Sequence, residues 1–291
     1  MNALLLMLAW LTPLVLLPML RTRFGRWVTP LAALPALATA LLISPGTVVE
    51  VPWLLLGAQF GLDASARTFL LFGSVLWLIA GVYATFYLQH DEHAARFYRF
   101  FLLAMSGNFG LIVGQDLVSF YLGFGLMGLA AYGLVVHDGN ETVRRAGRIY
   151  LVMTLIGELA LFAGFLLLYE RTGTLTPTPP QIASGAGWVE LSLLLTAFGI
   201  KAGLIGVHFW LPLAHPAAPV PASAVLSGAM IKTALIGWMR YLPLGAGSLP
   251  ELSAVLILAG LATAVLSIPL GLGQRDPQVV LAYASIGKLG L

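Results

Sequence analysis

The sequence predicts an all-α polytopic membrane protein with about ten transmembrane helices. Of its 291 residues, 59% are hydrophobic and only 9% are charged, whereas a soluble domain carries about 25% charged residues. The apolar residues gather in stretches of about 20, the length at which a helix crosses the hydrocarbon core of a bilayer. The arginines lie between these stretches or at their ends. A chain with this composition is expected to have the bilayer as its solvent.

The first apolar stretch is interpreted as a retained span and not as a signal peptide, because its basic residues follow it instead of preceding it. Residues 47–63 alternate and contain β-branched side chains, so a small hairpin on the outer surface is expected there. The last span opens near Val279 and stops at Leu291 after about half the length it needs. We therefore expect a fragment, one half of a split gene, or an end covered by a partner. The expected spans are 3–20, 27–43, 66–89, 100–114, 117–136, 149–168, 188–208, 219–239, 251–271 and the segment from 279.

Composition also excludes several classes of function. The chain has no cysteine, which rules out thiolate-held iron–sulfur clusters, disulfides and cysteine-based zinc sites, so any redox chemistry is expected on another subunit. A net charge of only +3 without a basic run argues against nucleic acid as a partner. No nucleophile–base set, metal-ligand cluster or nucleotide loop is present. We therefore predict no catalytic, cofactor-binding or metal-binding residues, and disfavour a membrane enzyme acting on quinone or lipid.

Loop charges predict the orientation. Basic residues alternate between the two sides, and the richer side is expected to face the cytoplasm of a cell (inner) membrane, with the N-terminus outside. The poorer side carries only Arg67, Arg171 and Arg240. The richer side carries Arg21, Arg23, Arg26, Arg96, Arg99, Arg144, Arg145, Arg148 and Arg275.

The three lysines behave differently from the arginines. Lys201, Lys232 and Lys288 all lie inside apolar spans, and Glu158 is the one acidic residue near the middle of a span. A charge at the bilayer centre costs about 2.5–3.5 kcal/mol on insertion scales, so such groups are paired, hydrated or neutral part of the time. Arginine stays charged, whereas a buried lysine can release its proton. The four residues therefore predict a proton path.

A structural interpretation stands beside this one. A single buried Lys–Glu pair can simply hold two helices together, and a lysine near a helix end, such as Lys288, can extend its ammonium group to the interface. His208 and His215 can serve proton entry or cap a loop. Asp116 and Asp138 are expected to be solvated loop residues.

Residues 200–240 predict a broken helix. Gly203 and Gly206 interrupt the pattern beside Lys201, and four prolines follow within the next fifteen residues. Transporters build ion sites at such interruptions, because the freed backbone groups face a cavity. The prolines are equally consistent with a simple connection between two spans.

These residues resemble the proton-antiporter-type membrane subunits shared by respiratory complex I, Mrp cation/proton antiporters and group 4 hydrogenases. The resemblance rests on a lysine, an H-x-W-L-P-x-A-H motif, an A-P-x-x-x-S-A motif, a second lysine and an arginine. Residues 274–291 resemble a later family motif, with Lys288 where glutamine is common. The matching positions are Lys201, His208 to His215, Ala218-Pro219, Ser223-Ala224, Lys232 and Arg240.

The resemblance implies an antiporter-like fold of two inverted five-helix repeats, each with a broken helix. It implies an N-terminal three-helix region at 1–98 with the outer hairpin, a first repeat at 99–240, and the truncated start of a second repeat at 241–291. It also implies partner membrane subunits in a respiratory, hydrogenase or antiporter complex. That complex would be of the NADH:quinone oxidoreductase or hydrogenase type, and this chain would contribute no catalytic centre or cofactor of its own.

One departure concerns the glutamate that pairs with the broken-helix lysine in the family. Gly125 stands in its place, and Glu158 lies in the next span. We hypothesise that Glu158 has become the partner of Lys201, forming an ion pair, with Lys232 and Lys288 further along the path. The alternatives are a structural subunit that transports nothing, a Na⁺/H⁺ antiport subunit, and a bicarbonate-uptake subunit.

Overall fold

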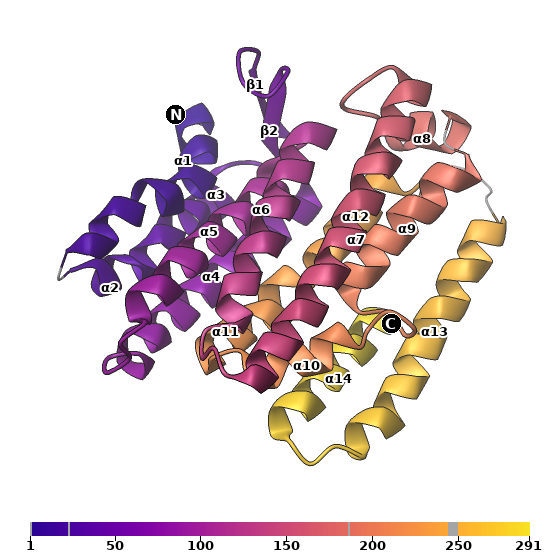
Figure 1. Cartoon of the computed structure of the whole chain (residues 1–291). Coiled ribbons are helices and arrows are strands. Elements are labelled where there is room, and N and C mark those ends of the chain that lie inside the picture. The colour runs from indigo at the N-terminus through magenta and orange to yellow at the C-terminus, as the bar shows by residue number, and fades with distance from the viewer. Residues whose placement is uncertain (1, 23, 186, 244–249) are drawn as a thin grey trace. The chain divides into compact units, whose positions relative to one another are not determined.

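The computed structural model describes residues 2–22, 24–185, 187–243 and 250–291, so the loop residue Arg23 lies outside the described residues. The chain is mainly helical (Figure 1), and its described part contains one two-stranded sheet. Seven helical segments within this part are long and apolar enough to cross a membrane. The predicted class, an all-α polytopic membrane protein, is confirmed.

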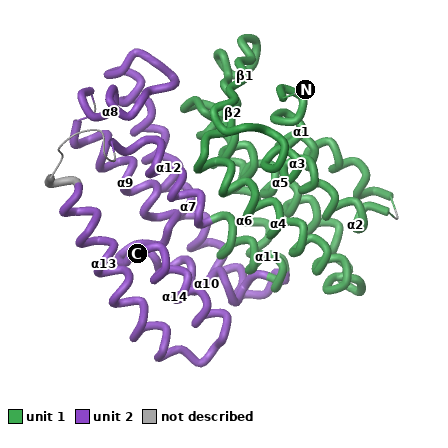
Figure 2. Tube along the Cα trace, turned by 180° about the vertical axis from the view of Figure 1, so that it is seen from behind, with its two compact units in different colours: residues 1–137, 219–230 green, residues 138–218, 231–291 purple. Residues whose placement is uncertain are grey.

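The chain divides into two compact units, which are coloured separately in Figure 2. The first unit comprises residues 1–137 and 219–230. Its helices are α1 (Asn2–Val15), η1 (Leu17–Arg21), α2 (Gly25–Val28), η2 (Pro30–Ala33), α3 (Leu34–Leu42), α4 (Ala64–Tyr87), α5 (Ala94–Val113), α6 (Leu117–Val135), α11 (Val220–Val225) and the π-helical turn η3 (Leu226–Met230); its strands are β1 (Thr47–Val51) and β2 (Ala58–Leu62).

The second unit comprises residues 138–218 and 231–291. It contains every residue of the predicted proton path. Its helices are α7 (Glu141–Thr172), α8 (Pro179–Gly185), α9 (Trp188–Ala202), α10 (Trp210–Ala217), α12 (Thr233–Tyr241), α13 (Pro250–Leu272) and α14 (Pro277–Gly290).

Each expected span contains a helix, but several boundaries differ from the prediction. Helices α5 and α7 begin earlier than expected, at Ala94 and Glu141, because their first turns are polar and escape a search for apolar runs. Helix α9 ends at Ala202, six residues before the expected end. The two units are groups of residues that pack together, whereas the predicted boundaries at 98 and 240 divide the chain into inverted repeats. The units do not test the repeats, which stay a prediction.

Short polar side chains begin four of the helices. Asp63, Asn140 and Asp276 each accept a hydrogen bond from a backbone N–H in the first turn of α4, α7 and α14. Asp116 does the same for α6, accepting from Ser119, and its second oxygen accepts from the backbone of Gln59 at 2.9 Å. Asp116 is fully buried, so the expectation that it is solvated was wrong.

The predicted hairpin is present. Strands β1 and β2 pair antiparallel, from Thr47 opposite Leu62 to Val51 opposite Ala58. The hydrogen bond from the Gln59 N–H to Asp116 connects β2 with the start of α6 and so holds the hairpin against the first unit.

Helices α5 and α6 approach each other at two glycines. A Cβ atom on Gly107 would lie 2.4 Å from the backbone nitrogen of Met127, and one on Gly123 would lie 2.5 Å from that of Leu111. Small residues are what allow two transmembrane backbones to come this close. Gly125, where the family carries its glutamate, lies in the same helix α6.

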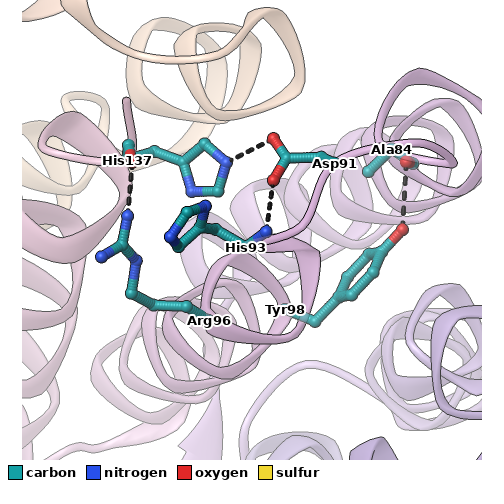
Figure 3. Close-up of polar contacts among 6 residues, drawn as sticks. All are labelled: Ala84, Asp91, His93, Arg96, Tyr98 and His137. Carbon is teal, nitrogen blue, oxygen red and sulfur yellow. Dashed lines mark hydrogen bonds and ion pairs between the residues drawn. The ribbon is translucent and has the colours of Figure 1, made fainter. Parts of the chain in front are cut away.

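A polar clamp joins two loops at one end of the first unit (Figure 3). His137, which is buried after α6, contacts Asp91 through Nε2 at 2.8 Å, and Arg96 donates to the His137 carbonyl. The backbone N–H of His93 donates to the other Asp91 oxygen at 2.6 Å. Desolvation acts to raise the pKa of Asp91, but the hydrogen bonds from His137 and His93 outweigh it and lower the pKa below its usual value.

Candidate functional site

The break in the helix begins at Gly203, two residues after Lys201. Gly203 adopts a left-handed conformation with φ of 73°, which glycine reaches without steric cost. The N–H of Gly203 donates to Ile200 and that of Leu204 to Gly199, so α9 ends in a Schellman-type cap. The chain is then irregular until α10 begins at Trp210. Lys201 therefore occupies the last turn of a helix, where the carbonyl ends favour a cation.

Two hydrogen bonds hold the break in shape. The indole N–H of Trp210 donates to the Ile200 carbonyl at 2.8 Å, which joins α10 to the end of α9. The Ile205 N–H donates to the Thr263 hydroxyl of α13 at 3.1 Å. The predicted broken helix is thus present in the second unit. The helix is interrupted at its glycines and not at its prolines.

Glu158 and Lys201 lie on two helices that pack together, α7 and α9. A Cβ on the neighbouring Gly157 would lie within 4 Å of Ile200 and of the Ala197 carbonyl, so the helices approach at this level. Each of the two charged residues is only 6% exposed. They interact electrostatically.

The described contacts of Glu158 include no hydrogen bond, so the direct ion pair expected from the sequence stays a prediction. Both carboxylate oxygens of Glu158 are buried, and neither accepts a hydrogen bond from a described residue. Burying a carboxylate without hydrogen bonds is costly unless a cation is near or the group takes up a proton. Lys201 supplies such a cation.

A second group of basic residues lies in the same unit. Lys232 lies two residues after the π-helical turn η3, at the start of α12, and is partly buried. Such π-helical turns occur frequently at functional sites. Lys232 interacts electrostatically with His215, which is buried in α10, and with Lys288 in α14. Lys288 itself is exposed, which agrees with a side chain that extends from its helix and differs from the expectation of burial.

His208 lies in the irregular segment between α9 and α10. Its ring centre is 5.9 Å from that of Tyr283 in α14, and its Nδ1 is buried without a hydrogen-bond partner among the described residues. His208 is partly buried. It thus belongs to the loop of the break and not to a helix end.

Two residues that sequence reasoning missed share a face of α7 with Glu158. Tyr150 is buried and its hydroxyl is hydrogen-bonded to Thr154. Tyr150, Thr154 and Glu158 are spaced by four residues, so they line up along one side of the helix. The Tyr150 ring also packs on Trp210 in a T-shaped contact at 5.3 Å. The spacing of these polar residues in an otherwise apolar span was the available signal.

An ion pair with one buried partner joins the C-terminal end of α7 to the N-terminal end of α9. Arg171 contacts Glu190, whose side chain is 1% exposed whereas that of Arg171 is 53% exposed. The sequence placed Arg171 in a loop and gave no sign of its partner.

Comparison with known proteins now identifies the family. The sequence family described as "NADH:quinone oxidoreductase/Mrp antiporter, TM" matches residues 114–291, more than half of the chain. The chain belongs to this family. As a member of it, the protein is an integral membrane protein.

Individual relatives agree with this assignment. NADH-ubiquinone oxidoreductase chain 4 of Tetraodon nigroviridis is 28% identical over 83% of this chain and 55% of its own length. Hydrogenase-4 component B of Escherichia coli is 28% identical over 79% of this chain and 35% of its own length. A chain in the structure of the Mrp complex from Dietzia superimposes with a TM-score of 0.83 at 24% identity, over 99% of this chain and 33% of that chain. This family member thus spans about a third to just over half the length of these relatives.

Proposed function

We propose that this chain translocates protons across the cell (inner) membrane, as a subunit of a complex I-like, hydrogenase-like or Mrp-like assembly. The observation that carries the proposal is the buried, electrostatically coupled pair of Lys201 and Glu158 at the break between α9 and α10. Groups of this kind are expensive in a membrane and mark ion pathways.

In the proposed mechanism, Glu158 acts as the partner of Lys201 from α7, in place of the glutamate that the family carries where this chain has Gly125. Proximity of the carboxylate holds Lys201 in its protonated form. Because no hydrogen bond locks the pair, a small change in the α7–α9 contact is sufficient to loosen it. Lys201 then releases its proton.

Lys232 is the proposed next acceptor. Its electrostatic interactions with His215 and Lys288 bring three basic groups close together, and a positive charge on one disfavours a positive charge on its neighbour, which favours onward transfer of the proton. Lys288 passes the proton further, and His208, in the loop of the break, serves proton entry.

The test is proton flux in vesicles that contain the native assembly. Lys201→Met is expected to abolish flux while the complex still assembles. Lys201→Arg keeps the positive charge but cannot release it, so it should also abolish flux. Arg275→Gln, which removes an exposed loop charge, should leave flux unchanged. Full flux in Lys201→Arg would exclude proton release by this residue.

The same preparation separates the alternatives. Sodium/proton antiport predicts counterflow of Na⁺ that is lost with Lys201→Met, and bicarbonate uptake predicts loss of labelled bicarbonate accumulation in cells. A structural subunit predicts that none of these fluxes responds to the Lys201 variants. We favour protons because the described path consists of lysines, histidines and one carboxylate rather than clustered oxygens.

The proposed orientation, with the N-terminus outside and the arginine-rich loops cytoplasmic, rests on the distribution of loop charges. The absence of cysteine allows a direct test with single introduced thiols. Arg144→Cys should be labelled only from the cytoplasmic side by an impermeant maleimide, and Thr178→Cys only from the outer side. Both positions are exposed. The reversed pattern would invert the proposed topology.

A further inference from the structure

The first unit contains a cavity of about 690 Å³ between η1 and the first half of α5. A volume of this size falls in the range of small-molecule sites, about 300–1,000 Å³. None of the residues of the proposed proton path lines it, since all of them belong to the second unit. The cavity therefore calls for a separate explanation.

The local structure shows why a space forms here. Helix α1 is fastened to α5 by a hydrogen bond from the Ser106 hydroxyl to the Trp10 carbonyl at 2.7 Å. Beyond Val15 the α-helix gives way to the tighter turn η1, with Pro18 among its first residues. The side of η1 and the start of α5 thus enclose a space that no described side chain fills.

Two arginines give the cavity its charge. Arg21 ends η1, and Arg99 lies in the second turn of α5; both are exposed. Within the described part of the chain neither forms an ion pair, and Arg99 donates only to the Ala95 carbonyl of its own helix. Asp91, in the loop before α5, is engaged by His137 and His93 instead (Figure 3). The cavity therefore presents two guanidinium groups without an anionic partner.

The remaining lining is apolar. Leu17, Leu20 and Leu103 contribute side chains to the wall, and no acidic residue is among the described lining. Arg21 is also the last residue of an apolar segment long enough to cross the membrane, Asn2–Arg21. The charged rim thus lies where such a segment meets the membrane surface, and the apolar wall extends from there along the helices.

We propose that this cavity is a binding site for an anionic phospholipid. Guanidinium groups recognise phosphate with paired hydrogen bonds, and basic pockets between transmembrane helices bind lipid headgroups. The phosphodiester lies between Arg21 and Arg99, and an acyl chain lies against Leu17 and Leu103. Inorganic phosphate would use the rim alone and leave the apolar wall in water, so the lipid is the better fit.

The probe is phosphatidylglycerol, compared with phosphatidylcholine of the same acyl chains, added to the purified chain in detergent. Native mass spectrometry gives the occupancy. Each basic residue near an anionic lipid contributes about 1 kcal/mol, so Arg21→Gln with Arg99→Gln should weaken phosphatidylglycerol binding roughly 30-fold. Arg144→Gln with Arg275→Gln changes the net charge equally at exposed positions that do not line the cavity and should leave binding unchanged. Millimolar inorganic phosphate should not displace the lipid.

A second variant keeps the test decisive if the arginine pair affects folding. Leu103→Trp fills the cavity without changing a charge, and it should also lose phosphatidylglycerol while its thermal unfolding without added lipid stays close to that of the wild type. Equal binding of the two lipids, or retention of phosphatidylglycerol by either cavity variant, would overturn the proposal. Displacement by phosphate would also overturn it, because the site would then recognise a free anion.

Discussion

A double-mutant cycle on Glu158 and Lys201 tests whether the two residues are coupled in the way their burial implies. The variants are Glu158→Gln, Lys201→Met and the combination of both. Each single change leaves one buried charge without its counterpart, which costs about 3–5 kcal/mol when a buried pair is broken. The combined change removes both charges, so the double variant should lose less stability than the two single variants together.

The expected coupling follows from the geometry. Glu158 accepts no hydrogen bond from a described residue. Opposite charges affect each other's ionisation within about 4–6 Å, and the middle of that range, about 5 Å, serves for the calculation. At that separation and an effective dielectric constant of about 20, two unit charges interact by about 3 kcal/mol. In thermal unfolding of a chain of this size, this corresponds to a departure from additivity of roughly 5 °C.

The assay is unfolding of the purified protein in detergent at neutral pH, followed by tryptophan fluorescence. A control cycle pairs Lys201→Met with Glu170→Gln, because Glu170 lies three turns further along α7 and is exposed. Distant sites add within about 0.3–0.5 kcal/mol. If the Glu158 cycle is as additive as the control cycle, the two residues are not an interacting pair and the proposed mechanism fails.

Three further outcomes are expected. Gly203→Ala should destabilise the protein by about 1–2 kcal/mol in thermal unfolding, because a Cβ opposes the left-handed conformation that ends α9; an unchanged transition would show that the cap is dispensable. Arg171→Gln should cost about 2–3 kcal/mol, less than for a fully buried pair because Arg171 is half exposed, whereas Glu190→Gln should cost less, since water can solvate Arg171. The reverse order would contradict this account. Asp91→Asn should remove a stabilising contribution that is complete above the unfolded pKa of the carboxyl group, 3.8, and that is lost as the pH falls through its lower folded pKa. The stabilities of wild type and variant, measured against pH, should therefore converge in acid. A difference in stability that does not depend on pH would contradict this account.

The sequence allowed the fold class to be predicted because a bilayer restricts the choices. Apolar length alone located a helix in each expected span, and Gly203 beside Lys201 marked the break. Helix starts were less predictable, because α5 and α7 begin in polar turns whose residues do not differ from loop residues in hydropathy. The cap of Asn140 on α7 was the local signal that a search for apolar runs passes over.

The residues of the candidate site could be predicted from the sequence, but the contacts between them could not. Charge in an apolar span identified Glu158 and Lys201, yet only the packing of α7 on α9 shows that they interact without a hydrogen bond. The residues around Asp116 in the sequence do not differ from those around a solvated acidic residue in a loop. Its burial depends on contact with a hairpin more than fifty residues earlier in the chain. Such facts are set by tertiary neighbours, which one sequence does not contain.

The glycine crossing of α5 and α6 limits how the first unit can change shape. Gly107 and Gly123 lie against the facing backbone, where a Cβ atom has no room. Neither helix can therefore rotate or slide along the other without bringing the Cβ atom of a neighbouring residue against the facing main chain. The interdigitated pair is therefore expected to move as a single rigid body. Gly125 lies two residues from this crossing on α6, so a large side chain introduced there could move only if α5 and α6 moved together. A hinge in this unit is therefore expected outside these two helices.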